Sequence, residues 1–426
     1  MIAAVRSSWA LFLGIALMML GNGLQGSLLG IRASLEGFPT TVTGTLMSGY
    51  YGGFLIGSVL APRLVARVGH VRVFAALASL ASTAILIHAV WVHPASWTVI
   101  RLVTGFCYAG LYVVVESWLN DQATNQTRGQ LLSLYMIVML GGAAGGQYLL
   151  NLADPGGVDL FILVSVLVSL SLIPLLLSTG RTPPFEAPCR VSVRELYRVS
   201  PTGAVGYFGT MLANGAYFGM GAVYGREIGL SVRDISVFVS LILLGGMFLQ
   251  WPIGRLSDAW DRRQVLTGVT LLAALFALLA GLAAERSLLG LFALTALFGG
   301  TTLPMYSLCI AYTNDYLQRD QIVNASGTLV LIGGVGAVFG PLTAAVAMQS
   351  FGPGAFFWWL ATIHAAIGAF ALYRMTRRRG VPRAAQGSYV AVAPRVSPVG
   401  GALYAEEASE EARAGAPAPG SRIAAR

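Results

Sequence analysis

The sequence has very little charge for a chain of its length. Of 426 residues only 11% are charged whereas 56% are hydrophobic, and lysine is absent, so that all 27 basic residues are arginine. So few charged side chains cannot cover the surface of a water-soluble globule, and we expect a lipid bilayer as the solvent. The net charge of +9 is then weak support for a nucleic-acid partner, and none is expected.

The sequence also lacks the patterns that enzymes and cofactor sites need. Cys107, Cys189 and Cys309 have neither metal-ligand nor redox spacing. No G-x-x-x-x-G-K-[ST] motif is present, which argues against direct use of ATP. Because Ser/His and paired-carboxylate constellations are missing too, we expect no enzyme, no catalytic residue, no metal and no cofactor.

Long apolar runs are what the sequence has instead. A membrane-spanning helix needs about 20 mostly apolar residues. The first run is too long for a signal peptide and is followed by many similar ones, so it is interpreted as a membrane helix. The predicted transmembrane helices, twelve in all, are 9–31, 41–66, 71–92, 95–119, 129–151, 157–178, 201–224, 232–255, 263–284, 287–312, 322–348 and 354–376.

The arginines predict the orientation in the membrane. Most lie at the termini and at the even-numbered connections: Arg6, Arg63, Arg67, Arg72, Arg128, Arg262, Arg263, Arg319, Arg377, Arg378 and Arg379. Positive residues accumulate on the cytoplasmic side of a membrane. Both termini are therefore predicted to be cytoplasmic.

The two halves of the chain repeat each other. Asn22-Gly23 matches Asn214-Gly215, and Tyr112 matches Tyr306 farther along. A parallel repeat of six-helix units predicts two bundles, 1–178 and 201–376. The Pro-rich, basic segment 179–200 reads as a cytoplasmic linker, and 377–426, rich in Ala, Pro, Gly, Ser and Glu, as a disordered cytoplasmic tail.

Residues 254–263, with the sequence Gly-Arg-Leu-Ser-Asp-Ala-Trp-Asp-Arg-Arg, resemble the cytoplasmic signature of the major facilitator superfamily (MFS). The resemblance implies an all-α membrane protein with the MFS fold of two pseudo-symmetric six-helix bundles. The run Glu116-Ser117-Trp118-Leu119-Asn120 with Arg128-Gly129 is similar to the YcaD-like branch of the superfamily. That branch belongs to the bacterial cytoplasmic (inner) membrane, and we expect a monomer there.

The signature predicts a gate. Asp258 at a helix end facing Arg262 and Arg263 forms a charge cluster that can clamp one conformation and release another. With Gly254 and Asp261 these are the predicted gating residues. The alternative is that the arginines serve only topology and helix termination. The first-half counterpart has Ala66 in place of the aspartate, so the gate is expected to be asymmetric.

Arg101 and Glu116 are charged residues within one apolar helix, about 22 Å apart along its axis. Charges inside a bilayer are costly and indicate function. Arg101-Leu102-Val103-Thr104-Gly105 resembles the fourth-helix arginine motif of the superfamily, which is implicated in proton coupling. We predict that Arg101 faces an anionic substrate or the outer gate and that Glu116 carries a proton. Alternatively, the two residues brace neighbouring helices or reach the two membrane interfaces.

Polar residues deep in the helices are the candidate substrate contacts. The predicted substrate-binding residues are Asn22, Gln25, Arg101, Tyr108, Tyr112, Asn214, Tyr217 and Tyr306, with Tyr50, Tyr51, Gln147 and Gln250 as further candidates. Hydrogen bonding or aromatic packing between helices is the alternative for each of them. His88 and His364 are interpreted as packing residues rather than as members of a proton relay.

The sequence therefore predicts a secondary active transporter that moves a small organic solute by alternating access, driven by protons. The expected partners are the small-molecule substrate, protons and membrane lipid. A membrane sensor or scaffold that keeps the fold without transport is the competing hypothesis. The degenerate first-half signature favours it.

Overall fold

The structure is a computed structural model that describes residues 2–124, 126–177, 192–378 and 380–393, together with 397, 399–401, 403, 404 and 407. Within these residues the chain is helical. The helices are α1 (Ile2–Leu35), α2 (Thr40–Val68), α3 (His70–Val90), α4 (Pro94–Gln122), α5 (Arg128–Tyr148), α6 (Asp159–Leu176), α7 (Val193–Val199), α8 (Pro201–Glu227), α9 (Val232–Ala259), α10 (Arg262–Ala283), α11 (Leu288–Asn314), α12 (Arg319–Phe351) and α13 (Ala355–Arg377).

The long helices coincide with the predicted runs to within about four residues, except that α1 begins at Ile2, ahead of the predicted start at residue 9. Among the described residues, ten helices are long and apolar enough to cross a membrane, judged by length and composition. Of the predicted spans, α2 and α8 are not among these ten, because glycine, threonine and tyrosine take many of their positions. The chain is thus a multi-pass membrane protein.

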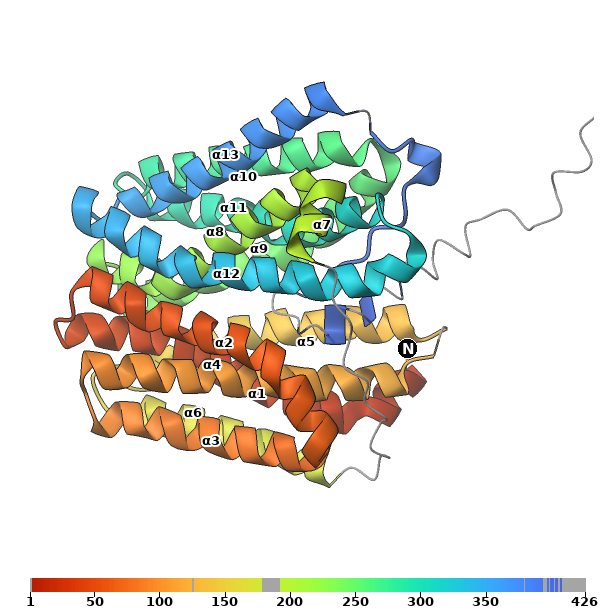
Figure 1. Cartoon of the computed structure of the whole chain (residues 1–426). Coiled ribbons are helices and arrows are strands. Elements are labelled where there is room, and N and C mark those ends of the chain that lie inside the picture. The colour runs from red at the N-terminus through yellow and green to blue at the C-terminus, as the bar shows by residue number, and fades with distance from the viewer. Residues whose placement is uncertain are drawn as a thin grey trace, which may run out of the picture.

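The helices pack in two groups that lie one above the other in Figure 1. In the first group α1 packs on α5 and α6, and α4 packs on α2 and α3. In the second group α8 packs on α12, and α11 on α9 and α10. Gly105 lets α4 approach α2 closely, since a Cβ atom there would overlap the carbonyl oxygen of Tyr50. This contact brings Tyr50 beside Arg101.

The groups also contact each other directly, through α2 with α12, α5 with α9 and α1 with α8. We call the face where α1 begins and α13 ends the terminal face, and the other one the opposite face (Figure 1). Near the opposite face four hydrogen bonds of 2.7, 3.0, 3.1 and 3.2 Å join the groups: Thr40 to Glu227, Thr41 to Gln349, Asn151 to Ser236 and Ser240 to Tyr148. The opposite face is therefore closed.

The segment after α13 differs from the prediction of a disordered tail. Its residues Val392, Ala393, Leu403 and Tyr404 are buried. Composition suggested that this segment could not bury a core of its own, but its apolar residues join the core formed by the helices. Residues 178–191, which hold most of the predicted linker and Cys189, and residues 408–426 lie outside the described residues.

Candidate functional site

A cavity lies between the two groups of helices and is formed by α1, α2, α4 and α5 together with α8 and α9. Its total empty volume, including the part open to solvent, is about 750 Å³. We call it the central cavity. Its polar lining residues are Asn22, Ser27, Tyr50, Tyr51, Arg101 and Gln147.

Arg101 supplies positive charge to the wall of the central cavity. The carbon of its guanidinium lies 4.4 Å from the centroid of the Tyr50 ring, and the ring face stabilises the cation. The hydroxyl of Tyr50 accepts a hydrogen bond from the amide of Asn22 at 3.1 Å. Arg101, Tyr50 and Asn22 thus form one polar patch from three helices.

Gln147 lines the same cavity, but its side chain also joins α5 to α1. Its Nε2 donates to the carbonyl oxygen of Gly23 at 2.8 Å, and its Oε1 accepts from the hydroxyl of Ser27 at 2.6 Å. Both polar ends of Gln147 are therefore engaged within the first group. Ser27 is a lining residue that the sequence analysis missed.

A second cavity, of about 470 Å³, shares Tyr50 and Tyr51 with the central cavity. It is lined in the second group by Tyr207 and Tyr306, whose ring centroids are 4.9 Å apart. The predicted contacts Asn22, Arg101 and Tyr306 therefore line one cavity or the other. Tyr50 and Tyr51 lie where the two spaces meet.

The other predicted contacts line neither of these cavities: Gln25, Tyr108, Tyr112, Asn214 and Tyr217. Tyr217 donates to the carbonyl oxygen of Phe238 at 3.0 Å within an aromatic cluster. The amide oxygen of Asn214 accepts from Thr302 at 3.5 Å. His88 and His364 likewise bond to Ala84 and Thr302 inside the helix packing.

Glu116 lies toward the terminal end of α4, on the same unbroken helix as Arg101, so the two do not pair. Its buried carboxylate accepts a hydrogen bond from the hydroxyl of Tyr135 at 2.9 Å. The hydroxyl of Ser397 and the main-chain N–H groups of Ser397 and Gly400 also donate to it, the last two at 3.1 Å. All four groups donate, which suits an acceptor-only carboxylate.

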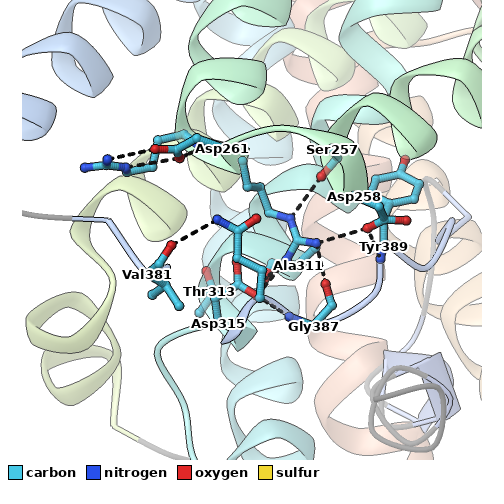
Figure 2. Close-up of polar contacts among 12 residues, drawn as sticks. Ser257, Asp258, Asp261, Ala311, Thr313, Asp315, Val381, Gly387 and Tyr389 are labelled. Carbon is cyan, nitrogen blue, oxygen red and sulfur yellow. Dashed lines mark hydrogen bonds and ion pairs between the residues drawn. The ribbon is translucent and has the colours of Figure 1, made fainter. Parts of the chain in front are cut away.

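The predicted gate centres on Arg262, which is buried. Its partners Ser257, Asp258, Asp315 and Gly387 lie together in Figure 2. Its guanidinium pairs with Asp315 at 2.6 Å and with Asp258 at 3.3 Å. It also donates to the hydroxyl of Ser257 and to the carbonyl oxygens of Ala311 and Gly387. Burial raises the pKa of Asp315 to about 6, although Arg262 opposes this shift.

The other half of the predicted cluster is separate. Arg263 pairs with Asp261 at 2.8 Å, and its hydrogen bonds lower the pKa of Asp261. Gly254 has a packing role, because a Cβ atom there would meet the ring of Tyr389 at 2.5 Å. Asp315 was missed as a partner of Arg262, although the internal repeat pairs it with Asp121. The signature thus joins α9, α10 and α11 to the segment after α13.

A bundle of membrane-length helices with a polar cavity between two groups is the architecture of a membrane transporter. The chain belongs to the Major Facilitator Superfamily, whose family model matches residues 11–196 and 203–408.

Similar proteins agree with this membership. The "Uncharacterized MFS-type transporter YcaD" of Escherichia fergusonii is 25% identical over 360 residues, covering 84% of this chain and 93% of that protein. Its Escherichia coli O6:K15:H31 counterpart is 26% identical over 365 residues, with the same coverage.

Solved transporters share the fold. The nucleoside transporter NupG has a TM-score of 0.68 at 13% identity and covers 89% of this chain and 100% of its own. A bacterial homologue of the human lysosomal transporter Spinster, in an inward-facing and occupied conformation, has a TM-score of 0.67 at 14% identity, covering 95% and 96%.

Proposed function

We propose that this MFS transporter is a secondary active transporter of a small organic solute in the bacterial cytoplasmic membrane, with both termini in the cytoplasm. It works by alternating access and is coupled to protons. The observation that carries the proposal is the polar patch of Arg101, Tyr50 and Asn22 in a cavity between the two groups. In this architecture the solute binds between the halves, which rock about it.

The polar patch fits a solute with an anionic group. A guanidinium held against an aromatic ring attracts a carboxylate or phosphate, while the ring offers an apolar surface. On the terminal side, Tyr51 and Tyr306 border the second cavity and would contact a solute on its way. Glu116, nearer the terminal face, would take up and release the proton.

A thermal-shift screen of the purified protein against a library of metabolites and drugs, at acidic and neutral pH, tests this proposal. A ligand of the folded state raises the melting temperature by mass action. We expect anionic hits whose shift is largely lost in Arg101→Gln but kept in Arg226→Gln, the same change at an exposed position near the opposite face. A stable protein without hits would favour the sensor or scaffold hypothesis.

Asp258→Asn is expected to change the balance between conformations open at the two faces, because it removes one of the two carboxylates that hold Arg262. The side chain of Asp258 is 46% exposed, so the effect should be below about 1 kcal/mol. Maleimide labelling of cysteines placed at Ser307 and Ser240 reports the terminal and the opposite side respectively. Equal labelling in wild type, Asp258→Asn and the control Asp234→Asn would contradict a clamp.

A further inference from the structure

The part of 380–407 that the structure describes, which we call the tail segment, runs from the second group of helices to the first. The N–H of Gly387 donates to Asp315 at 3.0 Å, that of Tyr389 to Asp258 at 2.8 Å and that of Val392 to Ser307 at 2.9 Å. Farther along, Ser397 and Gly400 donate to Glu116 in α4. The segment therefore ties α9 and α11 of one group to α4 of the other.

Side chains of the tail segment fill the space between these contacts. The ring of Tyr389 lies against Gly254 in α9, and the carboxylate of Glu407 lies against Gly129 at the start of α5. Ser397 and Tyr404 are buried, as are the apolar residues Val392, Ala393 and Leu403. The opposite face is closed by direct bonds between the groups, whereas here the tail segment bridges them.

The surface under the tail segment carries polar groups beside its apolar ones. The main-chain N–H groups of the tail segment donate hydrogen bonds to three carboxylates and one hydroxyl on this surface, those of Asp315, Asp258, Glu116 and Ser307. Such groups are well solvated when uncovered, whereas a permanently packed core is lined by apolar groups. Because the segment is tethered, its effective concentration is of the order of millimolar, so modest contacts suffice to hold it and a modest competitor displaces it.

We propose that the tail segment is a built-in plug that closes the terminal face and must withdraw before a solute can pass. It binds both groups, so it opposes the rocking that alternating access requires. It also occupies Glu116; insofar as Glu116 is the proton carrier, which rests on the proposed function, the docked plug blocks proton access from the terminal side. The docked state is therefore autoinhibited.

Cysteine labelling tests the plug without any knowledge of the substrate. In a background with Cys107, Cys189 and Cys309 replaced by alanine, Ser307→Cys places a thiol beneath Val392. The protein is held in lipid nanodiscs, where a water-soluble maleimide reaches both faces. We expect labelling to be about tenfold or more faster in a chain that ends at Arg378 than in the full chain, because labelling of the full chain requires transient opening. A synthetic peptide of residues 379–407 should slow it again.

A variant of the full chain guards against misfolding of the shortened one. Tyr389→Glu places a carboxylate beside Asp258 and should also speed labelling, whereas Ala385→Glu, the same charge at an exposed tail position, should not. Equal labelling rates in the full chain, the shortened chain and Tyr389→Glu would overturn the proposal. So would an equal acceleration at Ser240→Cys on the opposite side, since the segment would then be a general structural support.

Discussion

Glu116→Gln should abolish proton-coupled flux while the protein still folds and inserts. Glutamine keeps the size and one acceptor oxygen of Glu116, but it neither binds nor releases a proton near neutral pH. Losing a positioned proton-transfer group commonly costs roughly a hundredfold or more in rate. The measurement is proton uptake into proteoliposomes loaded with a ligand found by thermal shift.

The structure adds a complication that decides the design of this experiment. The carboxylate of Glu116 also accepts hydrogen bonds from Ser397 and Gly400. In glutamine an NH₂ group replaces one carboxylate oxygen, so a hydrogen-bond donor could face these donors. The substitution should therefore loosen the plug as well. Proton uptake must therefore be compared with and without the substitution, both in the full chain and in the chain that ends at Arg378. Only if Glu116→Gln abolishes proton uptake in both chains is the effect due to the lost proton carrier and not to a loosened plug.

Glu285→Gln is the matched control, since it makes the same chemical change at an exposed position. Tyr135→Phe gives an intermediate case, because it removes one donor and leaves the carboxylate in place. An unchanged proton signal in Glu116→Gln would refute the coupling role of this residue.

Hydropathy predicted the positions of the long helices well because each membrane helix satisfies its own backbone hydrogen bonds and so has a local signature. α4 (Pro94–Gln122) contains the whole predicted run 95–119 and extends it slightly at both ends. The two least apolar spans, α2 and α8, were nevertheless predicted from their apolar runs at 41–66 and 201–224.

The site was predictable in part. Scarcity made Arg101, Glu116 and Asn22 stand out, since each polar group inside a membrane needs a reason. Which face of a helix borders a cavity depends on how the helix is rotated relative to its neighbours, and the sequence does not give this rotation. The sequence therefore could not show that Tyr306 lines a cavity whereas Tyr108 and Tyr217 do not. The plug could not be predicted from the sequence, because the tail segment binds the carboxylates mainly through main-chain N–H groups. Every residue except proline has such a group, so these contacts require no particular residue pattern.

Arg262→Gln should destabilise the fold more than any other single change in the signature. Arg262 and Asp315 have side chains that are 1% and 2% exposed, and their charges meet at 2.6 Å. Removing one member of a buried ion pair leaves the other charge uncompensated and costs about 3–5 kcal/mol. Arg263→Gln is the control at the more exposed neighbouring pair and should cost about 1 kcal/mol or less. Thermal unfolding of the purified variants in detergent measures both.

The pH dependence of Arg262→Gln separates loss of the ion pair from a general packing defect. With Arg262 present the pKa of Asp315 is already raised to about 6 by burial, and without Arg262 only the hydrogen bond from the N–H of Gly387 still opposes that rise. A folded-state pKa above the ordinary value means that the folded variant binds the proton more tightly than the unfolded one. Its stability should therefore be highest below the ordinary aspartate pKa of 3.8 and fall as pH rises from there to the raised folded-state pKa.

The double variant Arg262→Gln, Asp315→Asn completes the argument. Asparagine is neutral at every pH and keeps an acceptor for the N–H of Gly387. The double variant should accordingly be more stable at pH 8 than Arg262→Gln alone and should lose the pH dependence. If instead the two substitutions destabilise additively and without dependence on pH, the buried pair of Arg262 and Asp315 does not hold the signature together, and the gate must be sought in the exposed contact of Asp258.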